Sequence, residues 1–270
     1  MSSSGDHALI AMPAIRRGSS DQLPVSYAVQ GEKSSPKWAS AFAAGCGGVA
    51  VTDDVLRPGP VALFGSPARQ RLLNEAIADG REFFYGDHGY FRRGRYFRIT
   101  KNGYQHDGRG THPSDRLEAL HLNRVHGWNS GGSAIIVCPN SPTYMAFFGM
   151  DAKAWTMEIV STLETITDRP VVIRWKSQAQ ARPLYVDLAD AWIVVVFSSA
   201  SAVEALIGGI PVCTLAPWAS TARMGITDIR QVESPIYPED RDQFLFNLAY
   251  QQWTLDEMRE GLAWKALANA

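Results

Sequence analysis

The stretch WIVVVFSSASAVEALIGGIPVCTLAP, residues 192–217, decides the fold class of this chain. It begins with an unbroken valine-rich run over 192–197 that is too short for a helix, which predicts a strand buried on both faces of a parallel sheet. A helix is expected over 202–207, because two glycines end its pattern, and another strand is expected over 212–215. The stretch therefore predicts one complete β-α-β unit.

Small polar side chains follow directly where the first of these strands should end. Ser198, Ser199 and Ser201 precede the expected helix, and Glu204 falls in its first turn. Open α/β sheets bind ligands at the carboxyl ends of their strands, and the free N–H groups at a helix start attract anions. The unit therefore predicts a polar crevice suited to a phosphate-bearing ligand.

The same residues resemble the donor-site segment of GT-B glycosyltransferases, closest to the capsule-polysaccharide and bacterial sialyltransferase-like families. The likeness rests on the pattern S-S-x-S-x-x-E-A-L-x-x-G-x-P-V over residues 198–212. In such families the serines meet the donor phosphate and the glutamate meets the ribose, so the resemblance implies a nucleotide-sugar site. An ordinary buried β-α-β crossover with a serine cap is the plainer alternative.

Length and composition limit the size of the core and the expected partners and location of the protein. The 270 residues, 46% of them hydrophobic, suffice for one large core or two small ones. A net charge of -1 and a pI near 6.6 give no general attraction to nucleic acid or membrane. The three cysteines lack metal spacing, which predicts buried free thiols in a reducing compartment. Without an apolar run long enough to span a bilayer, we expect a cytoplasmic protein, in the host cytoplasm for a phage protein.

The pattern before the central stretch also alternates between strands and helices. Strands are expected at 8–12, 49–51, 61–64 and 82–85, and helices at 38–44 and after Pro67. The small residues WNSGG at 128–132 then suggest a domain boundary. We expect an α/β protein with two Rossmann-like, mainly parallel sheets facing each other across a cleft, an acceptor-side domain at 1–130 and a donor-binding domain at 131–270.

The second half should complete its sheet around the central stretch. Strands are expected at 134–137 and 171–175, and helices at 151–167, 184–189, 241–250 and 254–268. The last helix should begin with Thr254 and Glu257 in a capping box. The irregular segment 218–238 is expected to lie over the donor. By the resemblance, the two C-terminal helices should cross back to the first domain.

Asp87 and His88 lie between glycines in GDHGY, residues 86–90, at the end of the expected fourth strand. A carboxylate and an imidazole there are suited to proton transfer, because glycine lets substrate approach the backbone. Bacterial sialyltransferases of GT-B form carry an acidic residue followed shortly by glycine that acts as the base, and Asp87 with Gly89 is similar. Whether Asp87 or His88 takes the proton stays open, as does a tight turn with a capping aspartate.

A basic and aromatic segment, FRRGRYFRITKNGYQHDGRGTHPSDR at residues 91–116, follows this turn. Cations beside flat rings can hold phosphates and stack bases, which predicts acceptor or nucleic-acid binding. The alternative is an edge hairpin with a solvated basic face. The residues expected to bind the acceptor are Arg92, Arg93, Arg95, Arg98, Lys101 and Tyr104.

The strand expected over 171–175 carries Arg174, and Lys176 follows it. Sialyltransferase-like families hold a short basic motif there that contacts the donor phosphate, so the resemblance implies a donor role for both residues, although the letters differ. A surface pair at a strand end is the alternative. Four histidines between 106 and 126 lack the spacing of a zinc site. We expect no metal site and no required cofactor besides the nucleotide-sugar donor as co-substrate.

Three functions fit these features. The first is a glycosyltransferase acting from a nucleotide sugar on an acceptor hydroxyl, with a hydroxymethylated base of DNA as the expected acceptor, as in a phage DNA-modifying enzyme. The second is a glycosyltransferase of surface or capsular polysaccharide. The third is a non-catalytic nucleotide- or nucleic-acid-binding protein. The lack of a membrane span favours the first over the second.

Overall fold

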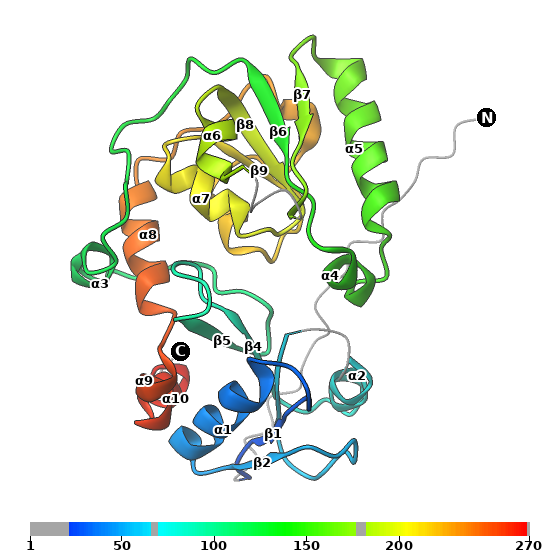
Figure 1. Ribbon diagram of the computed structural model, residues 1–270, viewed down its shortest axis with the longest axis vertical. Helices are drawn as coiled ribbons and strands as arrows, with labels where there is room; N and C mark the ends of the chain where they lie inside the picture. Colours follow the sequence, from blue (N-terminus) through cyan, green and yellow to red (C-terminus); the bar gives the residue numbers. More distant parts are fainter. Residues whose placement is uncertain (1–21, 66–69, 177–181, 269–270) are drawn as a thin grey trace.

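The computed structural model describes residues 22–65, 70–176 and 182–268, which form two sheets with helices around them (Figure 1). The strand expected at 8–12 and the helix start at Pro67 lie outside these residues. The first sheet has the order β2-β1-β3-β4-β5 and the second the order β7-β6-β8-β9. The expected α/β fold with two Rossmann-like parallel sheets is confirmed.

The first sheet is parallel except at one edge. It consists of β1 (Val25–Tyr27), β2 (Val49–Val51), β3 (Val61–Phe64), β4 (Phe83–His88) and β5 (Phe97–Lys101). Only β5 runs antiparallel to its neighbour, β4. Because this pairing extends to His88, Asp87 and His88 belong to β4 itself, and the alternative of a tight turn at these residues is wrong.

Strand β1 is absent from the sequence prediction because Ser26 interrupts its three-residue apolar run, whereas the three residues of β2 are all apolar. Two helices accompany this sheet, α1 (Ser35–Cys46) and α2 (Gln70–Ala78). Helix α1 ends at Gly47, whose φ of 74° suits glycine. Trp38 of α1 is fully buried under Gly86, where any Cβ would collide with the indole ring. This close approach fixes the end of β4 against α1.

The second sheet is entirely parallel and surrounds the central stretch. Its strands are β6 (Ala134–Val137), β7 (Val171–Ile173), β8 (Ala191–Val196) and β9 (Val212–Thr214). Its helices are α4 (Pro142–Phe147), α5 (Ala152–Ile166), α6 (Leu184–Leu188) and α7 (Ser201–Ile207). The predicted β-α-β unit is therefore confirmed as β8-α7-β9. Strand β7 ends earlier than expected, so Arg174 and Lys176 lie beyond it.

The chain then returns to the first half. After two 3-10 turns, η3 (Ser220–Met224) and η4 (Ile229–Gln231), come α8 (Arg241–Tyr250), α9 (Leu255–Arg259) and α10 (Leu262–Ala268). Thr254 and Glu257 form the predicted capping box. The single helix expected over 254–268 is wrong, because Gly261, with φ of 80°, separates α9 from α10. Both helices pack on α1, the return that the resemblance implies.

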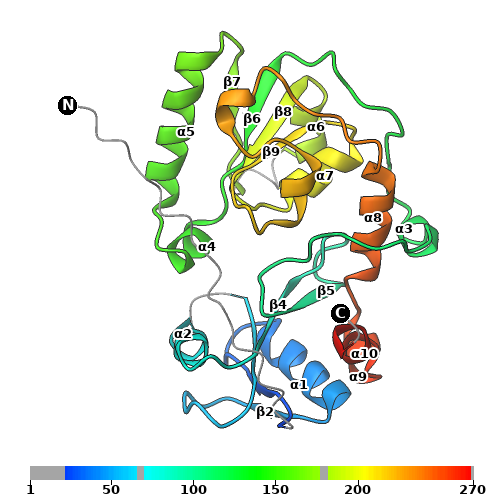
Figure 2. The same ribbon diagram turned by 180° about the vertical axis from the view of Figure 1, so that it is seen from behind.

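An aromatic cluster joins the two halves, which lie one above the other in both views (Figure 1, Figure 2). Tyr104, after β5, packs edge-on against Phe147, Phe148 and Trp218, with ring centroids 5.1–5.7 Å apart. Gln70 of α2 also donates a hydrogen bond to the carbonyl of Phe147 at 2.7 Å.

The described residues include no helix long and apolar enough to cross a membrane.

Candidate functional site

Asp87 forms a largely buried ion pair with Arg98. The two residues are direct partners in the β4–β5 ladder, and Nη2 of Arg98 lies 2.7 Å from Oδ2 of Asp87. The other carboxylate oxygen accepts a hydrogen bond from the backbone N–H of His88 at 2.7 Å. Since Arg98 is only 5% exposed, it does not belong to the open basic surface expected for acceptor binding. It holds the carboxylate of Asp87 instead.

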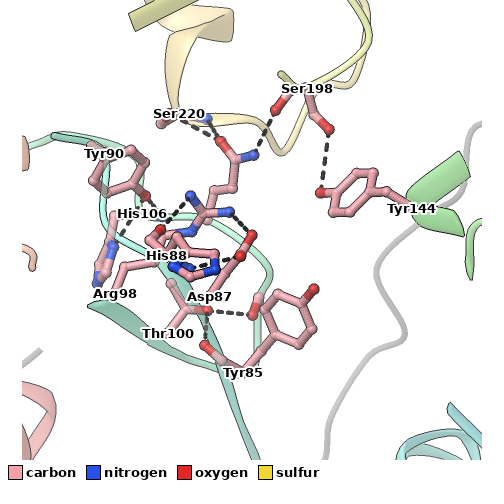
Figure 3. Close-up of polar contacts among 12 residues, drawn as sticks. Tyr85, Asp87, His88, Tyr90, Arg98, Thr100, His106, Tyr144, Ser198 and Ser220 are labelled. Atoms are coloured by element: carbon pink, nitrogen blue, oxygen red, sulfur yellow. Dashed lines mark hydrogen bonds and ion pairs between the residues drawn. The ribbon is translucent and has the colours of Figure 1, made fainter. Parts of the chain in front are cut away.

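Tyr90 and His106 form a second layer of side chains next to the Asp87–Arg98 pair (Figure 3). The guanidinium of Arg98 lies over the ring of Tyr90, 5.0 Å from its centroid. The Tyr90 hydroxyl accepts a hydrogen bond from the backbone N–H of His106 at 2.9 Å and shares another with its Nδ1 at 3.2 Å. Burial, with Arg98 nearby, lowers the pKa of His106 to about 3, so the ring is neutral at neutral pH.

His88 points to the other face of β4, as alternation along a strand requires. Its ring packs edge-on against Phe64 and stacks on Phe97, with centroids 5.3 and 5.7 Å away. Burial first, then the charge of Arg93, lowers the pKa of His88 to about 4, and its Nδ1 has no hydrogen-bond partner among the residues described. Of the two candidate bases, Asp87 shares its face of the sheet with the Tyr85 side chain, which packs against Phe147 of the second half.

The serines of the predicted donor site lie at the carboxyl end of β8. Ser198 is buried, and its hydroxyl donates to the Tyr144 hydroxyl at 3.3 Å. Its backbone N–H donates to the side chain of Asn140 at 3.2 Å. The hydroxyls of Ser199 and Ser201 lie 3.1 Å apart at the start of α7. Burial raises the pKa of Tyr144 to about 12, so its hydroxyl stays protonated.

Glu204 lies in the first turn of α7, as expected, with an exposed side chain. Packing around its carboxyl raises its pKa, and nearby Arg174 acts in the opposite sense. Arg174 itself is 8% exposed, and its Nε lies 3.4 Å from Oδ2 of Asp187. It also donates to the carbonyl of Arg182. Arg174 is therefore held within the second half, beside Glu204.

Lys176 is brought toward the Asp87 site from the opposite half. Its residue is exposed overall, and the pKa of its ammonium group is lowered first by the loss of surrounding water and then by the charge of Arg93, while Asp87 raises it. The charges of Lys176 and Arg93 also lower the pKa of His88. Lys176 and Arg93, far apart in the sequence, thus place positive charge from both halves around the end of β4.

The remaining residues of the expected acceptor surface are dispersed. Arg92 donates to the backbone carbonyls of Leu120 and His121. Lys101 pairs with Glu82 at 2.9 Å, and Arg95 lies over the ring of Tyr96, 5.5 Å from its centroid. Tyr104 is buried in the aromatic cluster between the halves and is not part of an open surface. An acceptor role for the exposed members stays a prediction.

Two cavities lie away from Asp87 and the serines, and the described residues form no cluster of metal ligands. One cavity of about 290 Å³ borders α3 (Asp115–Glu118), and another of about 190 Å³ lies between Tyr96 and Glu257. Across the described ranges, no three histidine, cysteine, aspartate or glutamate side chains cluster as metal ligands do. The chain has one Asp-x-Asp sequence, at Asp240 and Asp242, and the two carboxylates pair with Arg223 and Arg124.

Some residues at this site carry no signal in the sequence. Gln105 reaches Ser198 and Ser220 only through the association of the two halves, and Tyr144 reaches Ser198 through the folding of the second half. Tyr90 adjoins Gly89, but its contact with His106 depends on the course of the loop after β5. An alignment of distant relatives is the signal that reveals such residues.

No protein-family model matches the chain, and no relative is found among curated proteins. Among the solved structures that share the fold are two from Thermosulfurimonas dismutans. KpsC, beta Kdo 2,7 transferase, matches with a TM-score of 0.53 and 14% identity, over 91% of this chain and 100% of that chain. KpsC, beta Kdo 2,4 transferase, matches with a TM-score of 0.51 and 12% identity, over 86% of this chain and 92% of that chain. At such identities the likeness establishes the fold.

Proposed function

We propose that this chain is a glycosyltransferase that moves a sugar from a nucleotide-sugar donor to an acceptor hydroxyl. One observation carries the proposal. Asp87 at the end of β4 and Ser198 at the end of β8 lie on facing sides of the two halves (Figure 3), and the positive charges of Lys176 and Arg93 both lower the pKa of His88 at the end of β4. The fold that brings them together is shared with two Kdo transferases.

Asp87 is the proposed base. An acceptor hydroxyl is a weak nucleophile at neutral pH, so its proton must be accepted as the oxygen attacks the anomeric carbon. The carboxylate of Asp87 is fixed by Arg98 and by the N–H of His88, and it keeps 22% of its side-chain surface exposed. An oriented carboxylate that remains accessible is suited to this transfer.

The departing phosphate needs positive charge and hydrogen-bond donors. In the proposed mechanism Lys176 and Arg93 supply the charge, while Ser199 and Ser201 supply hydroxyls at the start of α7. Glu204 meets the ribose of the donor, as the sequence resemblance implies. Two cations so placed make a metal dispensable for neutralising the leaving group, so we propose transfer without a required metal.

For the acceptor we propose a saccharide hydroxyl. Two structural neighbours are named as sugar transferases, and the cations expected to bind DNA are partly engaged, Arg98 by Asp87 and Lys101 by Glu82. A duplex base would also have to be flipped out of the stack, at a cost of a few kcal/mol. A hydroxymethylated base of DNA is therefore the second candidate, favoured by the exposed Arg93 and Arg95.

The test is sugar transfer by the purified protein, followed by mass spectrometry. A panel of nucleotide sugars is offered with saccharide acceptors in one arm and with hydroxymethylated DNA in the other. Asp87→Asn should lower turnover by roughly 10²-fold to 10⁴-fold, while donor affinity measured by calorimetry stays nearly constant. Donor binding without any transfer would instead support a non-catalytic nucleotide-binding protein.

A further inference from the structure

The side chain of Gln105 bridges the two halves of the molecule. It lies in the loop after β5, and its Nε2 donates to the carbonyl of Ser198 at 2.9 Å. Its Oε1 accepts from both the backbone N–H and the hydroxyl of Ser220, each at 3.0 Å. One amide from the first half thus holds the end of β8 and the start of η3 in the second half.

The same loop is tied to the Asp87 site. His106, the next residue, binds the hydroxyl of Tyr90, and the ring of Tyr90 lies against Arg98. Arg98 in turn holds Asp87. A single segment, residues 98–106, therefore contacts the proposed base at one end and the proposed donor site at the other (Figure 3).

We infer that Gln105 is a positioning residue, which sets the placement of the donor-binding end of β8 relative to Asp87. The inference rests on the proposed function and extends it to a residue that touches neither substrate. Reacting atoms must lie within about 3.5 Å in line, and a misplacement of about 1 Å can cost roughly 10²-fold in rate. An amide with all three hydrogen bonds across the junction has the rigidity that such placement needs.

The discriminating variant is Gln105→Glu. The acid has the same shape and still accepts from Ser220, but its ionised form cannot donate to the Ser198 carbonyl. We expect kcat to fall by about 10²-fold at neutral pH, with the donor Kd changed by less than about threefold, because Gln105 itself does not contact the donor and the serines and Glu204 proposed to bind it all lie in the second half. At acidic pH the protonated carboxyl regains an O–H donor, so the ratio of variant to wild-type kcat should rise.

Two further variants complete the experiment. Gln243→Glu makes the same change in a glutamine whose Nε2 donates to the His112 carbonyl at 2.8 Å, outside the proposed site, and its kcat should match wild type. Gln105→Met keeps the length of the side chain without a donor or a charge. Gln105→Met should lower kcat by a similar factor at every pH. It still tests the positioning role if the Gln105→Glu variant does not fold.

The outcomes separate the two proposals. Transfer by the wild type with near-normal kcat in both Gln105 variants overturns the positioning role and leaves the glycosyltransferase proposal intact. A low kcat in Gln105→Glu without acid rescue, together with a donor Kd raised in proportion, also overturns it, because binding alone is then damaged. An absence of transfer by the wild type, with every donor and acceptor in the panel, contradicts the proposed function, and the positioning role falls with it.

Discussion

The pairing of Asp87 with Arg98 illustrates how an arginine changes role with its neighbour. An arginine in a basic run suggests a solvated or ligand-binding cation, and sequence alone gives no reason to bury it. The antiparallel pairing of β4 and β5 places it directly opposite a carboxylate, which makes burial possible. Asp87 could be singled out from the sequence by its glycine neighbours, but the position of Arg98 depends on strand register.

Arg98→Met tests this pair through stability. Removal of the guanidinium leaves Asp87 without its partner in a mostly buried position, and such losses cost about 3 to 5 kcal/mol. Because Asp87 keeps 22% of its surface exposed, we expect the lower end of that range. Urea denaturation measures the change. The double variant Asp87→Asn, Arg98→Met should recover part of the stability, and equal losses in the single and double variants would contradict the pairing.

The half-buried ring of His106 predicts a pH dependence. Its pKa is about 3 in the folded protein against an ordinary 6.5, so below about pH 6.5 the unfolded chain binds a proton that the folded chain does not. The stability is complete above that pH and falls as the pH drops toward 3. Between about pH 7 and pH 5 we expect this side chain to account for a loss of about 1 to 2 kcal/mol.

Denaturation at both pH values measures this loss. His106→Gln should show a flatter dependence of unfolding free energy on pH than the wild type. His112→Gln is the control, because His112 has an exposed side chain stacked on Tyr250. An unchanged slope in His106→Gln would mean that other groups carry the acid sensitivity.

At the scale of elements, segments with an apolar run or a helical period bounded by glycine follow from sequence, and elements set by a single cap or by tertiary packing do not. The β8-α7-β9 unit and helix α5 have patterns that local periodicity determines. Helix α4 is only six residues long, and its start depends on Ser141 accepting from the N–H of Tyr144. The break at Gly261 depends on tertiary packing, which no local pattern reports.

That packing predicts the effect of one methyl group. Gly45 of α1 lies so close to α9 that a Cβ would collide with the carbonyl of Met258. Gly45→Ala should therefore destabilise the protein by about 1 to 3 kcal/mol, since backbone atoms must move to accommodate it. Thermal denaturation measures the effect. Gly127→Ala is the matched control, because nothing lies within 4 Å of its added Cβ and stability should change little.

At the scale of the whole molecule, the opposition of the two sheets is the feature that sequence reasoning reaches only by resemblance. The contacts that create it are aromatic and polar side chains scattered over the chain, among them Tyr104, Phe147 and Gln105. Tyr104 shows why these contacts are hard to predict from sequence. Beside basic residues it suggests a stacking surface, yet its ring fills the junction, because the second half covers it.

Tyr104→Ala tests whether this junction makes the halves unfold together. Loss of a large buried ring costs about 3 to 5 kcal/mol, and here it removes contacts to Phe148 and Trp218 across the junction. We expect one calorimetric transition for the wild type and two for the variant, as the halves lose their coupling. One unbroken transition in the variant would show that α8 to α10 suffice to hold the halves together.

The return of α9 and α10 to the first half has a consequence for biosynthesis. Met258, Ala263 and Leu267 complete the core around Trp38 and Phe42, which were translated more than 200 residues earlier. Until α9 and α10 emerge from the ribosome, that face of α1 therefore has no cover, and domains that cannot close during synthesis expose apolar surface to aggregation. The second half can form its parallel sheet first. The first half must wait for the last helices to emerge.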